Sequence, residues 1–442
     1  MWLLPLFPWI ARGAAYTYYR IRYGGGPVPR AGPVLLVANH PNSLLDPVLV
    51  VAAARRPVRF LAKAPLFVDP KVGWLVKAVG AIPVHRRADD PTQMDRNDEM
   101  FRAVHAELAG GAAVGIFPEG LSHSEPALAP LRTGAARIAF GAYAITGRPF
   151  PIVPVGLVFR QKDIFRSAAL VLVGSPVPWD DLAPRGAGDE DAVRLLTARV
   201  TEALQQLTVN LERWQDQPLV DCAMRIWEAE RGAPPVPGER VTRLGITTRI
   251  LAAVRQSGDP AASALARDVE AHHRRLRRLG LRPADLVADV GLARSAGWAV
   301  RRAPLVMPLA AALAVVGYLL FWVPYRLTGI AVDRTRLESD VRSTHKLLWG
   351  IAIYGVWLLA LAAAGSVALN VWVGLGLLLG VPAVGLAGLV TRERMRGAGS
   401  DVRRFVLLHS RRALAETLRA AQRDLGVRLD ALYQDFAARG VV

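Results

Sequence analysis

The chain has 442 residues, of which 52% are hydrophobic, and its mean hydropathy is positive. It is therefore long enough for two or three domains and more apolar than soluble proteins usually are. The formal net charge of +18 attracts polyanions, and long uncharged runs without zinc-finger spacing or an aromatic RNA-binding signature exclude nucleic acid and favour anionic membrane lipids as the partner. The single cysteine, Cys222, excludes an internal disulfide and a cysteine-based metal cluster.

Residues 1–30 are predicted to lie at a membrane surface. Aromatic side chains are interleaved there with Arg12, Arg20 and Arg22, and aromatic rings settle at the depth of lipid headgroups. A cleaved signal peptide is the alternative, but it would place basic residues before the apolar opening, and this sequence does not.

Residues 31–215 are predicted to form an α/β domain, because short apolar runs alternate with stretches of helical periodicity. This alternation favours a largely parallel sheet flanked by helices. The runs predicted to be strands are 33–39, 58–63, 80–84, 112–118, 151–159 and 169–174.

A helical connector is predicted at 216–302, and a hydrophobic membrane region follows at 303–390. Each of its apolar stretches is long enough to cross a bilayer core of about 30 Å as a helix. The predicted spans are about 304–325, 347–366 and 370–390, with a tight turn between the last two. A basic amphipathic helical tail at 391–442 is predicted to lie on the membrane or against a packed partner.

The excess of lysine and arginine places the catalytic side, the loop after the first stretch and the tail all on the cytoplasmic face. Three full crossings do not satisfy this distribution. Either the first stretch dips into the bilayer or lies oblique while 347–390 crosses twice, or all three stretches span. Both arrangements describe an integral membrane protein with a cytoplasmic catalytic domain.

The motif "NHPNSLLDP" places His40 and Asp46 after a predicted strand end, where parallel α/β sheets bind ligands. An uninterrupted helix would separate the two side chains, but Pro41 and the following "NS" supply a turn that brings them together. A carboxylate on one ring nitrogen leaves the other free to take a proton from a hydroxyl. A packed or solvent-facing histidine is the alternative. The pattern predicts acyl transfer to an alcohol supplied by the substrate.

Three later stretches follow the histidine motif: "GAIPVHRR" (80–87), "IFPEGLSHSEPALAPLRTGAARIA" (116–139) and "PIVPVG" (151–156). In order and separation, the four blocks resemble those of the glycerophosphate and lysophosphatidate acyltransferase superfamily, over roughly residues 30–215. Five residues lie between His40 and Asp46, whereas lysophosphatidate acyltransferases usually have four. This spacing and "FPEGLSH" resemble the subgroup of fungal glycerol-3-phosphate and dihydroxyacetone-phosphate acyltransferases.

The resemblance implies the glycerolipid acyltransferase fold and a role for each matching residue. His40 would be the general base and Asp46 its orienting partner. Arg86 would bind the acceptor phosphate, with a surface ion pair as the alternative. Glu119 and Gly120 would shape the acceptor site, although Glu119 would alternatively hold Arg86 or cap a helix. Ser122 would hydrogen-bond the phosphate or lie in a solvated turn.

The predicted function is therefore a membrane-bound glycerolipid O-acyltransferase of phospholipid biosynthesis. An acyl thioester, on coenzyme A or acyl carrier protein, is the donor and co-substrate, and acyl carrier protein is also a candidate partner. The acceptor is glycerol 3-phosphate, dihydroxyacetone phosphate or lysophosphatidate. No bound cofactor and no metal site are predicted. A coenzyme A-independent phospholipid transacylase and a non-catalytic membrane scaffold remain as alternatives, whereas a hydrolase is disfavoured because the sequence lacks a GxSxG nucleophile elbow.

Overall fold

The computed structural model describes residues 2–70, 72–86, 95, 97–232, 237–287, 292–335 and 339–439. The chain divides into two compact units. The first consists of Met1–Trp214, Pro235–Thr248 and Glu338–Thr344, and the second of Gln215–Pro234, Arg249–Leu337 and His345–Val442.

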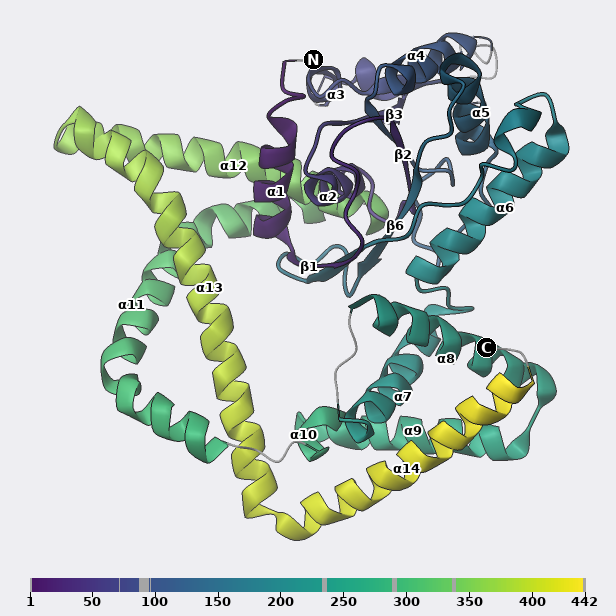
Figure 1. Cartoon of the computed structure of the whole chain (residues 1–442). Coiled ribbons are helices and arrows are strands. Elements are labelled where there is room, and N and C mark those ends of the chain that lie inside the picture. The colour runs from purple at the N-terminus through teal and green to yellow at the C-terminus, as the bar shows by residue number, and fades with distance from the viewer. Residues whose placement is uncertain are drawn as a thin grey trace. The chain divides into compact units, whose positions relative to one another are not determined.

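A sheet lies inside the first unit, with helices on either side of it (Figure 1). It has seven strands in the order β1-β7-β6-β2-β5-β3-β4. All neighbouring strands are parallel except β6 and β7, which are antiparallel. The strands are β1 (Arg20–Gly25), β2 (Val34–Ala38), β3 (Val58–Lys63), β4 (Ile82–Val84), β5 (Ala113–Ile116), β6 (Ile152–Phe159) and β7 (Ala168–Val173). The structure confirms the predicted α/β class with a largely parallel sheet.

Helices cover both faces of this sheet. On one face α2 contacts β3 and β7 and packs against α1, and on the other face α4, α5 and α6 form a layer (Figure 1). Apolar side chains of β2, β5 and β6 and of α4–α6 form one continuous core. The helices are α1 (Phe7–Tyr18), α2 (Leu45–Ala54), α3 (Gly73–Ala78), α4 (Asn97–Ala109), α5 (Gly134–Thr146) and α6 (Glu190–Leu207).

Residues 20–25, which lie inside the predicted interface segment, form the edge strand β1. Its pairing with β7 begins at Arg20 opposite Ala168. Arg20 and Arg22 are exposed and alternate with the half-buried Ile21 and Tyr23. Charged residues are common on edge strands, where they discourage pairing with other chains.

The second unit contains a bundle in which α14 packs against α7, α9 and α10. Its core includes Cys222, Ile226, Val269 and Leu425. The bounds are α7 (Gln217–Glu230), α9 (Pro260–Leu279), α10 (Pro283–Val287) and α14 (Arg412–Ala438), while α8 (Pro237–Ser257) has residues in both units. The amphipathic tail thus uses its apolar face in packing within the protein.

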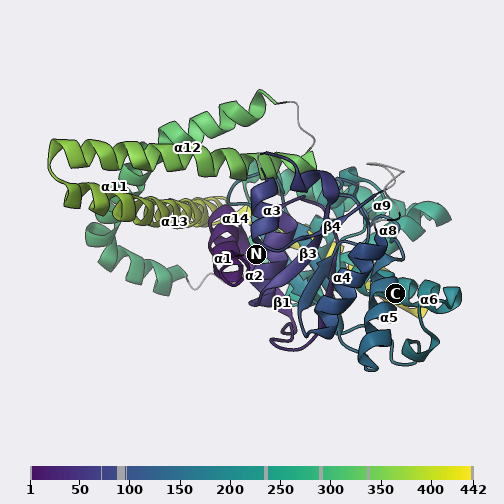
Figure 2. The same ribbon diagram turned by 90° about the horizontal axis from the view of Figure 1, so that it is seen from above.

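In the part of the chain that the structure describes, three helical segments are long and apolar enough to cross a membrane: Pro308–Asp333, Val341–Ala368 and Val371–Ser410. They belong to the long helices α11 (Leu292–Asp333), α12 (Ser339–Ala368) and α13 (Val371–Ser410) in Figure 2. These segments confirm the three predicted apolar stretches.

Local contacts define two features of these helices. The turn predicted between the second and third stretches is present, and the side chain of Asn370 caps α13 by accepting from the Val373 amide at 3.0 Å. α11 packs against α13, and a side chain added at Gly317 would come within 3.3 Å of the Gly388 Cα. α11 continues unbroken through 304–325, so the chain does not reverse direction within that stretch.

Candidate active site

The predicted catalytic pair lies at the carboxyl end of β2, where the chain turns into α2. His40 follows the strand, and Asp46 lies in the first turn of the helix. The Nδ1–H of His40 donates to Oδ2 of Asp46 over 2.9 Å, so the structure brings the two side chains together. Among the residues that the structure describes, none hydrogen-bonds to Nε2 of His40. This second ring nitrogen is therefore available to take a proton.

The turn between the two residues has an unusual backbone conformation. Ser43 has a φ of +45°, in the left-handed region that residues with a Cβ seldom adopt. The amide of Asn42 donates to Oδ2 of Asp46 over 2.6 Å. The carboxylate oxygen that orients His40 thus also closes the turn.

Asp46 is fully buried, with 0% of its surface exposed. Burial raises the pKa of the Asp46 carboxyl above its ordinary value, because desolvation disfavours the charged form more than the bonds from His40 and Asn42 favour it. Its Oδ1 atom has no hydrogen-bond partner within the described part of the chain. A buried carboxylate in this position fixes the tautomer of the imidazole and stabilises the imidazolium that proton transfer produces.

An aromatic stack supports the His40 ring from the next strand. The ring of Phe117, directly after β5, lies parallel to the imidazole with a centroid distance of 4.0 Å and an interplanar angle of 9°. Phe60 on β3 continues the stack at 5.4 Å from Phe117. Phe117 is part of the "IFPEG" block, but no local sequence pattern predicts that its ring lies against His40.

Glu119 is buried and links three parts of the site. Its Oε1 accepts from the backbone amide of His40 at 2.7 Å, and its Oε2 accepts from the amide of Ala129 at 2.8 Å and from Nε2–H of His123 at 2.5 Å. Both carboxylate oxygens are therefore occupied by protein groups. Glu119 acts on the site by holding the loops after β2 and β5 together.

Gly120 lies close to two arginines. The Nη1 of Arg86 donates to the Gly120 carbonyl over 3.1 Å. A Cβ at Gly120 would come within 2.6 Å of Nε of Arg132. Gly120 has a φ of +76°, a backbone conformation that favours glycine. Arg87, in the same block as Arg86, lies outside the described residues.

Ser122 joins the turn of the catalytic pair. Its hydroxyl oxygen accepts from the amide of Ser43 at 3.1 Å and lies 3.2 Å from the Ser43 hydroxyl. The structure therefore gives Ser122 a contact inside the protein, in place of the solvated turn considered from the sequence. A role in phosphate binding stays a prediction.

A buried polar cluster behind the turn was not predicted from the sequence. The hydroxyl of Tyr19 donates to the Lys162 carbonyl and accepts from the side-chain amide of Asn42 at 2.6 Å. The Lys162 ammonium in turn donates to the carbonyl of Pro41 at 2.7 Å. Burial raises the pKa of the Tyr19 hydroxyl, so it stays protonated and able to donate.

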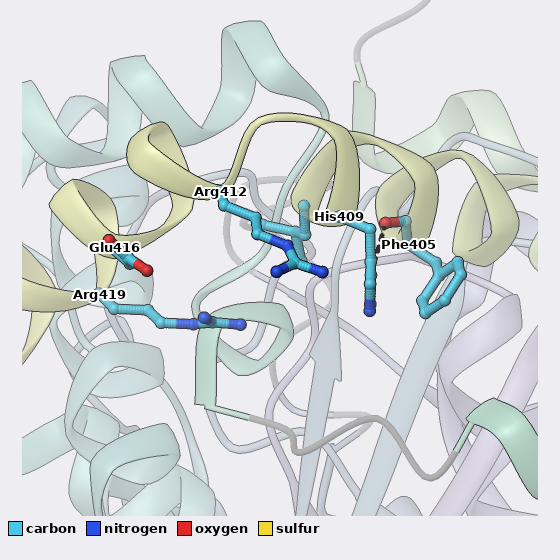
Figure 3. Close-up of a pocket in the computed structure, with 6 residues that line it drawn as sticks. Phe405, His409, Arg412, Glu416 and Arg419 are labelled. Atoms are coloured by element: carbon cyan, nitrogen blue, oxygen red, sulfur yellow. Dashed lines mark hydrogen bonds between the residues drawn. The ribbon is translucent and has the colours of Figure 1, made fainter.

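A hollow of about 170 Å³ lies in the second unit where α13 meets α14 (Figure 3). Nδ1–H of His409 donates to the Phe405 carbonyl at 3.1 Å, and Arg412 and Arg419 are exposed beside Glu416. None of these residues belongs to the four sequence blocks. We assign this hollow no part in the reaction.

The geometry around His40 has a definite chemical meaning. The site holds a histidine oriented by a carboxylate, as in serine hydrolases, but no described serine or cysteine side chain hydrogen-bonds to Nε2. Two guanidinium groups lie at the neighbouring Gly120. Such a site suits a substrate that brings its own hydroxyl nucleophile together with an anionic group.

Comparison with known proteins agrees with this geometry. Residues 20–158 match the family model described as Acyltransferase. The chain is 30% identical over 190 residues to glycerol-3-phosphate O-acyltransferase 2 of Saccharomyces cerevisiae, covering 42% of this chain and 25% of that protein. It is 23% identical to glycerol-3-phosphate O-acyltransferase 1 of the same yeast, covering 79% of this chain and 59% of that one.

A bacterial relative is similar over a shorter region. The 1-acyl-sn-glycerol-3-phosphate acyltransferase of Bacillus subtilis is 28% identical over 163 residues, which cover 36% of this chain and 71% of that protein. The chain thus spans a quarter to somewhat over half the length of the two yeast proteins. The matches confirm the resemblance that the four blocks predicted.

Proposed function

We propose that this chain, whose residues 20–158 match the family model described as Acyltransferase, is a member of the glycerophospholipid acyltransferase superfamily and transfers an acyl chain from a thioester to a hydroxyl of a phosphorylated glycerol acceptor. The observation that carries the proposal is the hydrogen bond between His40 and Asp46, with Nε2 of the imidazole left available. The names of the yeast and bacterial relatives support glycerol 3-phosphate and lysophosphatidate as acceptors.

His40 is the general base of the proposed reaction. Its Nε2 takes the proton of the acceptor hydroxyl while the hydroxyl oxygen attacks the thioester carbonyl. The tetrahedral intermediate then collapses, the carbon–sulfur bond breaks, and the imidazolium returns the proton to the thiolate. The products are the new ester and a free thiol, and no acyl-enzyme forms. Asp46 stabilises the imidazolium during this cycle.

Arg86 and Arg132, which both lie close to Gly120, are proposed to bind the acceptor phosphate. Arg86 is half-buried and bound to the Gly120 carbonyl, whereas Arg132 is exposed. A guanidinium is planar and presents two parallel N–H groups to a phosphate, so a pair of them gives both charge and orientation. The place of Arg132 beside Gly120 is visible only in the fold.

The membrane region is proposed to keep this reaction at the bilayer, where the acylated product belongs. The three apolar helical segments would anchor the chain, and the net charge of +18 would hold basic surfaces against anionic lipids. The lysine and arginine distribution supports a cytoplasmic catalytic domain. Coenzyme A or acyl carrier protein would then deliver the thioester from the cytoplasm.

The proposal is tested with purified full-length protein in liposomes. A labelled acyl thioester is offered with glycerol 3-phosphate, dihydroxyacetone phosphate or lysophosphatidate, beside a His40→Ala variant. We expect a labelled product with one acceptor and its loss in the variant. Labelled phospholipid offered without a thioester tests the transacylase alternative. If parent and variant are both inactive in every arm, acyl transfer is excluded for these substrates and the scaffold alternative is favoured.

A further inference from the structure

The N-terminal part of α12 contacts the loop of the catalytic pair, although it lies about 300 residues further along the chain. Within the described residues of this part of the helix, Ser343 is 0% exposed and Thr344 is 6% exposed. Residues 338–344 belong to the same compact unit as the sheet. Two polar side chains buried at this place need hydrogen-bond partners, and both find them beside His40 and Asp46.

Thr344 binds the backbone at the start of α2. The first amides of a helix have no partner inside the helix, and the residue before α2 offers no side-chain cap. The amide of Leu44 donates instead to the hydroxyl oxygen of Thr344 at 3.2 Å. The two preceding amides, of Asn42 and Ser43, donate to Asp46 and Ser122. Thr344 is thus one of three side chains that hold the turn.

Ser343 reaches the same turn from the polar cluster behind it. Its hydroxyl donates to the Lys162 carbonyl at 2.6 Å, which also accepts from Tyr19. The ammonium of Lys162 donates to the carbonyl of Pro41, next to His40. Two adjacent residues of α12 therefore support both ends of the turn. Ser343 supports Pro41 indirectly, through Lys162, and Thr344 binds Leu44 directly.

These contacts matter because the turn holds Ser43 in a conformation that residues with a Cβ seldom adopt. The left-handed Ser43 persists only where surrounding groups fix it. The turn sets the distance between His40 and Asp46, so a loosened turn misplaces the base.

We infer that Thr344 and Ser343 are positioning residues for the catalytic pair, and that they couple it to the membrane region. The uncharged run begins at Leu347, three residues after Thr344. The chain that supports the turn is therefore the chain that enters the bilayer. This inference rests on the proposed function, because it assigns the turn a role in that reaction.

The variant Thr344→Val tests the inference, since valine keeps the shape but removes the hydroxyl that accepts from Leu44. We expect the kcat of acyl transfer to fall about 10- to 100-fold, as displacements of about 1 Å do, with KM for both substrates within about twofold of the parent. Thr344→Ser retains the hydroxyl and should keep most of the rate. Ser343→Ala should lower kcat in the same direction.

Thr201→Val is the matched control. Thr201 lies on α6, where its hydroxyl donates to the carbonyl of Thr197 in the preceding helical turn, so the same chemical change is made away from the catalytic pair. We expect its kcat to equal that of the parent. A Thr344→Val enzyme with parental kcat would overturn the inference. Equal losses in Thr344→Val and Thr344→Ser, with KM raised in both, would also overturn it, because they indicate general damage.

Amide hydrogen exchange provides a readout that does not require activity. Peptides covering residues 40–46 should exchange faster in full-length Thr344→Val than in the parent or in Thr201→Val, because the Leu44 amide has lost its acceptor. Unchanged exchange would overturn the contact itself. An inactive parent with faster exchange in Thr344→Val would refute the proposed function while establishing the contact.

Discussion

Substitution of Gly120 by alanine separates backbone strain from phosphate binding. Its φ of +76° is costly for any residue with a Cβ, by about 1–2 kcal/mol. The new Cβ would lie 2.6 Å from Nε and 2.9 Å from Cδ of Arg132, both closer than atoms can approach. Since these atoms belong to a flexible side chain, the arginine moves aside. The added methyl group thus displaces the guanidinium at little further cost in stability.

The expected loss follows from the contact that Arg132 gives up. A hydrogen bond to a charged group contributes about 1.5–3 kcal/mol. With about 1.4 kcal/mol for each factor of ten, kcat/KM for the acceptor should fall about 10- to 150-fold. The loss should appear mainly as a higher KM for the acceptor, while KM for the thioester stays at its parental value. The apparent Tm should fall by about 2–4 °C per kcal/mol of strain for a unit of this size.

A double-mutant cycle completes the test. Arg132→Ala alone should cause the same loss of acceptor binding, and Gly120→Ala should add none to it, because there is no guanidinium left to displace. The strain at residue 120 should remain and should lower the Tm in both backgrounds. If Gly120→Ala lowers the Tm but leaves KM for the acceptor unchanged, Arg132 does not bind the phosphate. Fully additive losses would refute the displacement mechanism.

Three further changes test the catalytic pair and its supports. Asp46→Asn should lower kcat by about 10⁴-fold, as neutralising the orienting carboxylate of a catalytic triad does. Because burial raises the pKa of Asp46, the charged carboxylate destabilises the folded protein at pH 7, so the variant should have a higher Tm than the parent at pH 7 and lose this advantage as the pH falls towards 4. A variant with a lower Tm than the parent at pH 7 would contradict the desolvation argument. Phe117→Leu removes the ring stacked on His40, a contact of about 0.5–1.5 kcal/mol, and should lower kcat about 2- to 10-fold in steady-state assays. An unchanged kcat would exclude a role for the stacked ring in orienting His40. Glu119→Gln places amide hydrogens against the donors of Ala129 or His123 and should cost about 1–3 kcal/mol in thermal or denaturant unfolding; an unchanged midpoint would show that the carboxylate is not needed to join the two loops.

Much of the sheet was predictable because buried parallel strands are continuous apolar runs. The six predicted runs correspond to β2–β7. The edge strand β1 was missed because its exposed Arg20 and Arg22 alternate with less buried residues, so that the segment resembles a basic membrane-interface sequence. The apolar stretches of the membrane region were equally clear, since length and absence of charge define them without any tertiary contact.

The catalytic pair was predictable for a local reason, whereas its supports were not. His40 and Asp46 lie six residues apart, and the turn signals between them indicated that they meet. The partners of the turn lie 79 residues away at Ser122 and 300 away at Thr344. Their contacts depend on which strands are neighbours and on where α12 begins, and no local pattern contains that information. For the same reason, the place of Arg132 beside Gly120 was not predictable from the sequence.

The five-residue spacing between His40 and Asp46 explains why the site depends so strongly on distant side chains. A turn with one residue more than the common spacing has an additional backbone amide to satisfy at the helix start. Here that stretch passes through the left-handed Ser43, and the amides of Asn42, Ser43 and Leu44 bind three different side chains. One of these is Asp46 itself, and the others come from the β5 loop and the N-terminal part of α12. A longer turn is less determined by its own sequence, so the geometry of His40 and Asp46 depends on the loop after β5 and on the start of a long apolar helix.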